Sequence, residues 1–176
     1  MKTVIQNNES ALIASFACLG KTTFAKNHPD VAIDIESIFY VYDHDVAKED
    51  EETAKSSDLG TSNIHFPDNY IADVIKSIGK YRFIFLTLSA EILSKLDTLG
   101  IEYVILYPTK ARRSQIVEDS RLRGNNEDFV EMIAGMLDDD THHDRFKRTL
   151  NYKAFEYLDE DTYIEDYIQE KYEYEK

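Results

Sequence analysis

Short apolar runs alternate with stretches of helical periodicity along this chain. The runs at 11–15, 31–35, 83–88 and 101–107 are rich in Ile, Val, Leu and Phe, and their lengths are typical of strands. They are apolar throughout rather than alternating, which predicts strands that are buried on both faces of a parallel sheet. A fifth strand is expected at 154–158, where Phe155 and Tyr157 should belong to the core.

The segments between these runs fit helices. Pro29 disfavours helical geometry in the residue before it, so the first helix should end by His28. Ser89 and Asn126 are suitable N-caps for later helices. Helices are expected at 21–27, from Pro67 to Gly79, from Ser89 to Gly100, from Asn126 to Leu137, around 145–150 and from Thr162 onward.

The order of these elements predicts an α/β fold with three layers. A mainly parallel five-stranded sheet should carry helices on both faces, with the 11–15 strand central and the strand that ends in Asp34 beside the one that ends in Leu88. With 176 residues, one domain is expected over 1–176. Residues 1–10 should form a polar lead-in. An acidic insertion at about 42–63 is either a solvated surface arm or a segment that covers a substrate.

A Gly-Lys-Thr-Thr stretch at 20–23 directly follows the first strand and begins the first helix. This context is the one in which backbone N–H groups and a helix N-terminus surround a polyphosphate. Lys21 can reach the β- and γ-phosphates, and the Thr22 hydroxyl can bind Mg²⁺. A chance match in a helix that starts after a glycine is the alternative. The loop residues expected to bind the nucleotide are Ser15, Gly20, Lys21, Thr22 and Thr23.

The composition narrows the classes of partner. A formal net charge of −14 argues against broad binding to a nucleic-acid backbone, although small phosphorylated ligands need only a few local cations. No apolar run approaches the roughly 20 residues needed to cross a bilayer, and Cys18 is the only cysteine. These features predict a cytoplasmic protein without a disulfide framework.

A second informative segment, 109–125, gathers Arg112, Arg113, Arg121 and Arg123 in an otherwise acidic chain. These arginines are candidates for a lid over bound phosphates. Alternatively, they are ordinary helix partners of Glu118 and Asp119. The histidines His65, His142 and His143 lack metal-type spacing and are expected on the surface.

Taken together, these stretches resemble the P-loop kinases of small molecules, the group that contains nucleoside monophosphate kinases, shikimate kinase and gluconate kinase. The likeness is greatest to uncharacterised phage-encoded members classed as nucleotide kinases, and it covers about residues 10–170. It is carried by the segments 20–23, Asp34-Ile35-Glu36-Ser37, 66–71, Tyr107-Pro108 and Arg123-Gly124-Asn125 followed by Phe129.

The resemblance implies transfer of the γ-phosphoryl group of ATP, with Mg²⁺, to a small acceptor such as a nucleoside or deoxynucleoside monophosphate. Lys21, Asp34 and Arg123 would be catalytic, and Thr22 and Asp34 would hold the metal. Asp34, Glu36 and Ser37 would face the acceptor. The donor phosphates would be bound by the loop residues given above and by Arg112, Arg113 and Arg121. A homodimer is compatible with this sequence.

Some positions depart from the family pattern. Ser15 and Cys18 stand where glycines are usual, and Asp119 stands where related lids carry a cation. The strand that ends at Leu88 lacks a terminal aspartate. Asp34 could also serve only as a cap or ion-pair partner at the end of its strand. A protein that binds or sequesters a nucleotide without turnover is therefore the second hypothesis for function.

Overall fold

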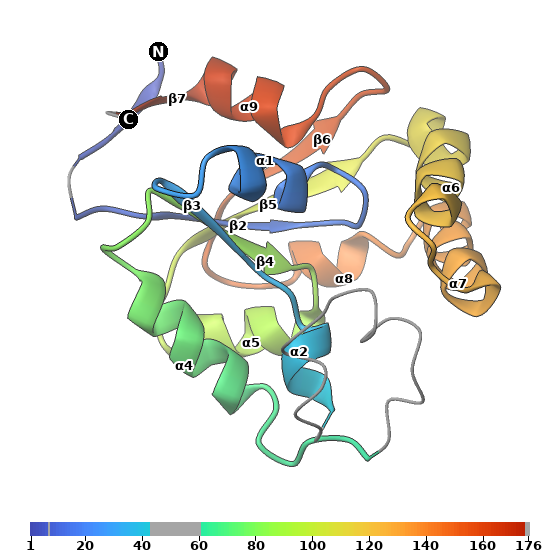
Figure 1. The fold of residues 1–176 in the computed structure, drawn as a ribbon, viewed down its shortest axis with the longest axis horizontal. Coiled ribbons are helices and arrows are strands. Elements are labelled where there is room, and N and C mark those ends of the chain that lie inside the picture. The colour runs from blue at the N-terminus through green and yellow to red at the C-terminus, as the bar shows by residue number, and fades with distance from the viewer. Residues whose placement is uncertain (7, 43–60, 175–176) are drawn as a thin grey trace.

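The computed structural model describes residues 1–6, 8–42 and 61–174. A five-stranded sheet lies at its centre, with the strand order β3-β4-β2-β5-β6 (Figure 1). Each neighbouring pair is parallel. The strands are β2 (Ala11–Ser15), β3 (Ala32–Ile35), β4 (Phe83–Thr87), β5 (Tyr103–Pro108) and β6 (Tyr152–Leu158).

This arrangement confirms the predicted α/β class, the parallel sheet and the central position of β2. It also confirms that β3 lies beside β4, where Asp34 is in register with Phe85. The middle strands are buried on both sides, because Ile13, Ala14 and every residue from Phe83 to Leu86 have no exposed surface. Apolar burial of this extent is the main favourable contribution to folding.

Helices cover both faces of the sheet. Figure 1 shows α1 and α9 over one face, α4, α5 and α8 over the other, and α6 and α7 as a pair beyond the ends of the strands. The helices on the two faces are α1 (Lys21–Asn27), α4 (Asp68–Ser77), α5 (Ala90–Thr98), α8 (Asp144–Lys147) and α9 (Ile164–Lys171). The others are α2 (Ile38–Val41), the 3₁₀ turn η2 (Lys110–Arg112), α6 (Arg113–Leu122) and α7 (Glu127–Asp138).

The two ends of the chain form a second, small sheet that was not predicted. Strand β1 (Thr3–Ile5) pairs in parallel with β7 (Tyr172–Tyr174). The expected polar lead-in therefore contains a strand, and Ile5 is buried. The expected terminal helix ends at Lys171, before β7.

Two further expectations need correction, and a third lies largely outside the described residues. The helix expected around 145–150 begins and ends earlier, at Asp144–Lys147. Tyr157 is 44% exposed and is not a core residue, because β6 is at the edge of the sheet. Most of the acidic insertion, residues 43–60, is not described. Within the described part of the chain, no helix has the length and apolar character needed to span a membrane.

Phe83 links the main sheet to the terminal sheet. Its ring lies 5.8 Å from the ring of Phe24, 5.4 Å from that of Tyr172 and 4.8 Å from that of Tyr174. The side chain has no exposed surface. It therefore contacts one helix and the C-terminal strand at the same time.

We predict that Phe83→Ala lowers the free energy of unfolding by roughly 3–5 kcal/mol, because it leaves a cavity among these rings. Urea denaturation followed by circular dichroism measures the change. Leu150→Ala is the control, since Leu150 is 82% exposed and its truncation should cost less than about 0.5 kcal/mol. Equal losses in the two variants would contradict the proposed role of Phe83, and Phe83→Leu serves if the alanine variant does not fold.

Candidate functional site

The carboxyl ends of the parallel strands meet at one edge of the sheet. The loop between β2 and α1, the end of β3 and the pair formed by α6 and α7 all lie there (Figure 1). Ligands of open parallel sheets bind outside the strand ends, where neighbouring connections diverge. From β2 the chain crosses to β3 on one side of the sheet, whereas β5 lies on the other side of β2 and is followed by β6 farther out. The connections therefore diverge beside β2.

The β2–α1 loop, residues 16–20, has two backbone positions in the left-handed region. Gly20 has a φ of 100° and directly precedes α1, while Cys18 has a φ of 61°. Glycine adopts this region at no steric cost, whereas an L-residue with a side chain does not. Cys18 thus has a backbone conformation that is usually adopted by glycine. The loop keeps a tight turn although it contains fewer glycines.

Residues from α1 and β3 come together beside this loop. The Thr22 hydroxyl donates a hydrogen bond of 2.7 Å to Oδ2 of Asp34. Lys21 is only 8% exposed, and its Nζ lies 3.9 Å from Oε1 of Glu36. The structure therefore brings four of the predicted site residues together. Lys21 and Thr22 lie at the start of α1, and Asp34 and Glu36 follow it in the sequence.

The carboxyl group of Asp34 is in an unusual environment. Its pKa is raised to about 7, chiefly because the group is buried; the charge of Lys21 lowers the pKa, and the nearby Glu36 raises it. Its Oδ1 is buried and has no hydrogen-bond partner among the described residues. A buried carboxylate oxygen without a partner is costly, and a bound cation is one way to compensate it.

The donor set at this point fits Mg²⁺. The described residues contain no group of three or more His, Cys, Asp or Glu side chains that could hold a metal ion by themselves. Magnesium, however, is usually bound by one or two protein oxygens together with water and substrate phosphates. The Thr22 hydroxyl and the Asp34 carboxyl group match that requirement.

Two residues without a predicted role at the site, Tyr70 and Thr87, hold the end of β3 in place. The Tyr70 hydroxyl donates to the carbonyl oxygen of Ile35 over 2.7 Å and accepts from the backbone N–H of Thr87 over 3.1 Å. The Thr87 hydroxyl accepts from the backbone N–H of Ser37 over 3.1 Å. Tyr70 lies in the expected helix after Pro67 and in the 66–71 segment that carries the resemblance, but the sequence assigns it no role at the site. A buried tyrosine needs a partner for its hydroxyl, and this requirement was the available signal.

Three of the four arginines of the 109–125 segment have partners within the protein. Arg112 has no exposed surface; its Nη1 donates to the carbonyl oxygen of Thr162, and its guanidinium lies 4.7 Å from the ring centre of Tyr163. The Nη2 of Arg113 donates to Asp138 over 2.7 Å. Arg121 pairs with Glu127. Neither Glu118 nor Asp119 takes part in these ion pairs.

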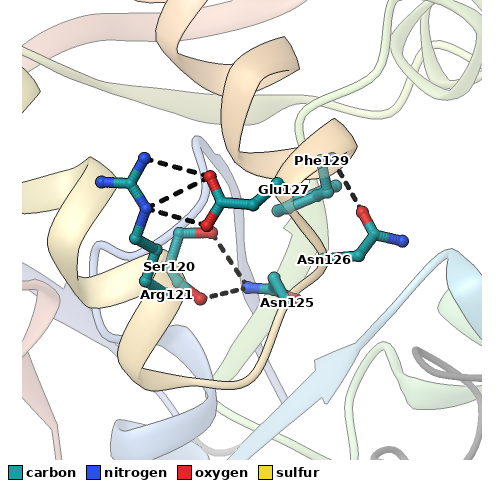
Figure 2. A network of polar contacts seen from close by, with 6 residues as sticks. All are labelled: Ser120, Arg121, Asn125, Asn126, Glu127 and Phe129. Carbon is teal, nitrogen blue, oxygen red and sulfur yellow. Dashed lines mark hydrogen bonds and ion pairs between the residues drawn. The ribbon is translucent and has the colours of Figure 1, made fainter.

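Arg121 belongs to a clasp that fixes the turn between α6 and α7 (Figure 2). Its guanidinium contacts both carboxylate oxygens of Glu127. Asn125 Nδ2 donates to the carbonyl and to the hydroxyl oxygen of Ser120, each over 3.0 Å. Asn126 caps α7 by accepting from the backbone N–H of Phe129. The clasp, Ser120, Arg121, Asn125, Asn126 and Glu127, thereby holds the two helices as a hairpin.

Arg123 lies in the turn that this clasp holds. Its side chain is exposed and takes part in none of the hydrogen bonds or ion pairs of the residues that the structure describes, while its backbone N–H donates to the carbonyl oxygen of Asp119 over 3.1 Å. The next residue, Gly124, has a φ of 77°, which lets the chain reverse direction. Of the four predicted arginines, Arg123 is the one that remains available for a ligand.

Two cavities meet at the loop and at Arg123. The smaller, of about 450 Å³, lies between the β2–α1 loop, α6 and the start of α9, and its lining includes Thr23, Leu122 and Tyr163. The larger, of about 750 Å³, lies between the ends of β3 and β4, α7 and α8. Cys18 and Arg123 line both. Both volumes are in the range of small-molecule sites.

The larger cavity also contains a histidine that was expected on the surface. His142 is only 5% exposed, so that expectation was wrong. Its Nδ1 shares a hydrogen bond of 2.8 Å with the Tyr107 hydroxyl. Burial lowers the pKa of His142, and the neighbouring Arg145 lowers it further. His65 is exposed as expected.

A scan against models of protein families found no match, and a search of curated proteins found none either. The assignment of function therefore depends on the geometry of the site.

We predict that His142 makes stability fall as the pH is lowered below about 6.5. Its pKa is lowered from the usual 6.5, so the unfolded chain binds a proton in this range more readily than the folded protein does. Stability is then lost on acidification, by at most about 1.4 kcal/mol per pH unit. The free energy of unfolding of the wild type minus that of His142→Gln should decrease from pH 7.5 to pH 5. His65→Gln is the control, and a difference for His142→Gln that does not vary with pH would contradict the prediction.

Proposed function

We propose that this protein is an ATP- and Mg²⁺-dependent kinase of the P-loop type, and that it phosphorylates a small acceptor such as a nucleoside or deoxynucleoside monophosphate. One observation carries the proposal. Two cavities of small-molecule size meet at the β2–α1 loop, which directly precedes Lys21, and Arg123 lines both of them. Phosphoryl transfer needs a donor and an acceptor bound next to each other, with cations that stabilise the charge on the transferred group.

The smaller cavity suits the base of the donor. Phe24, Leu122 and Tyr163 contribute apolar and aromatic surface, against which a flat ring can pack. The Tyr163 hydroxyl is fixed by a 2.6 Å hydrogen bond from Gln115 Nε2. Arg112, predicted as a phosphate ligand, instead supports this wall, because it stacks on Tyr163 and holds Thr162.

The β2–α1 loop suits the donor phosphates. Gly20 lies at the N-terminus of α1, where backbone N–H groups favour an anion. Lys21 would neutralise charge on the transferring phosphoryl group. Because Lys21 is buried, its electrostatic attraction to that group would be stronger than in water. Thr22 and Asp34 would hold the metal. When bound, Mg²⁺ neutralises the phosphate oxygens and orients them.

The larger cavity suits the acceptor. Glu36 and Ser37, predicted to face it, contribute to its wall together with Lys21. Asp34 lies behind them, in contact with Thr22. Arg123 would stabilise charge on the transferred phosphoryl group from the side opposite the β2–α1 loop. The hairpin of α6 and α7 would act as the lid over both cavities.

Nucleotide binding without turnover is the second candidate function. Two observations favour it. Cys18 adopts a strained left-handed conformation in the loop, and Lys21 is within 3.9 Å of Glu36 rather than clear of carboxylates. A panel of nucleoside and deoxynucleoside monophosphates with ATP and Mg²⁺, followed by ADP release, distinguishes the two. ADP formation that depends on an acceptor supports the kinase, whereas ATP binding without ADP formation supports the second function.

We predict that Lys21→Ala abolishes detectable binding of ATP with Mg²⁺, because the variant lacks the buried cation next to the loop. Isothermal titration calorimetry measures the affinity. Lys26→Ala is the matched control, since Lys26 lies on the same helix but is exposed. Unchanged ATP affinity in a folded Lys21→Ala protein would refute the phosphate-binding assignment of the loop.

We predict that Arg123→Ala lowers the turnover rate and the specificity constant together, by roughly 10²-fold or more, as expected for a cation that acts mainly in the transition state. The melting temperature should stay almost unchanged, because Arg123 forms no ion pair with the described residues. Steady-state kinetics and thermal melting measure both quantities, with Arg148→Ala as control. Near-normal turnover would reject the role of Arg123. Near-normal turnover after all four arginines are neutralised would reject the lid.

A further inference from the structure

The larger cavity contains one cation that the proposed reaction does not yet use. Its described lining includes three Lys or Arg side chains, which are Lys21, Arg123 and Arg145. The first two adjoin the donor phosphates in the proposed function. Arg145, on α8, is exposed and does not line the smaller cavity. Its side chain takes part in none of the hydrogen bonds or ion pairs of the described residues, although its charge helps to lower the pKa of Asp139. An unpaired arginine on the wall of a largely apolar cavity is suited to an anionic group of a ligand.

The segment that carries Arg145 is anchored through His142 and Phe146. His142 and Phe146 are 5% and 3% exposed, and their rings lie 5.4 Å apart. His142 is bonded to the hydroxyl of Tyr107 on β5. Its ring also lies 6.4 Å from that of Phe16, which is in the β2–α1 loop. The backbone that carries Arg145 is therefore anchored to the sheet and to the loop, so that only its exposed side chain has to be ordered when a ligand binds.

The rest of the cavity is suited to a flat apolar body. Helix α7 contributes Phe129, Met132 and Met136 to the lining. Phenylalanine packs against the face of a ring, and methionine adapts to its outline. Glu36 and Glu91 are the lining carboxylates among the described residues, and they would repel an anion that approached them. The anion of the acceptor is therefore expected on the Arg145 side.

Resting on the proposed function, we propose that Arg145 binds the anionic group of the acceptor and selects phosphate monoesters of ring-bearing compounds over their uncharged counterparts. Nucleoside monophosphates have this combination, whereas the corresponding nucleosides lack the anion. Arg145 acts as a specificity-determining residue. His142 and Phe146 act through it, by fixing the segment to which it belongs.

Calorimetry with nucleoside 5′-monophosphates and the matching nucleosides tests this assignment, in the presence of Mg²⁺ and a non-hydrolysable ATP analogue. The wild type should bind at least one monophosphate at least tenfold more tightly than its nucleoside, in line with hydrogen bonds between charged groups. Arg145→Gln should reduce that ratio to below about threefold and leave the affinity for the ATP analogue unchanged. Arg145→Lys, which keeps the charge, should recover part of the ratio.

Arg148→Gln is the matched control, because Arg148 follows the same helix and is exposed but does not line the cavity. Where turnover is measured, Arg145→Gln should raise the Michaelis constant for the acceptor at least tenfold with little change in the turnover rate. An unchanged ratio in Arg145→Gln, or no monophosphate preference in the wild type, would overturn the assignment. Binding that depends on Arg145 without any ADP formation would reject the kinase function and leave the Arg145 assignment intact.

Discussion

The burial of the central strands on both faces determines where chemistry can occur in this protein. Ile13, Ala14 and the residues from Phe83 to Leu86 are fully covered, so no ligand can reach the middle of the sheet. Because neighbouring strands are parallel, their carboxyl ends reach the same edge. The loop after β2 and the residues after β3 are thus neighbours in space. The hydrogen bond between Thr22 and Asp34 follows from this constraint.

The net charge of −14 conceals an uneven distribution of cations. Acidic side chains in fixed positions pair with Arg113 and Arg121, and aromatic and backbone contacts hold Arg112. These interactions build the hairpin and the wall beside α9. Arg123 and Arg145 remain without such partners among the described residues, and both line the larger cavity. Carboxylates therefore hold Arg113 and Arg121 in structural roles, and few cations remain available to bind a ligand.

The sequence predicted what depends on local pattern and missed what depends on distant contacts. Apolar runs and Gly20 next to Lys21 predicted the strands, the order β3-β4-β2 and the residues at the strand ends, because the periodicity and the crossover rules are strong. The terminal sheet was missed, since Thr3–Ile5 is too short to stand out without its partner. His142 was misjudged because its burial depends on Tyr107, which is 35 positions away in the sequence. The partners of Arg113 and Arg121 could not be chosen from the sequence, because Asp138 and Glu127 are no closer to them along the chain than other carboxylates.

The clasp between α6 and α7 affects how Arg123 can work. A surface arginine on a flexible loop would lose side-chain and backbone entropy when it bound a phosphate. Here Asn125 and Asn126 cap the adjoining helix ends, and Arg121 pairs with Glu127 across the turn. Only the Arg123 side chain still has to be ordered on binding. The hairpin is joined to the sheet through η2, where the buried Arg112 contacts Thr162 and Tyr163. Tyr163 in turn packs near Gly20, so the position of the hairpin and the position of the loop depend on the same few contacts.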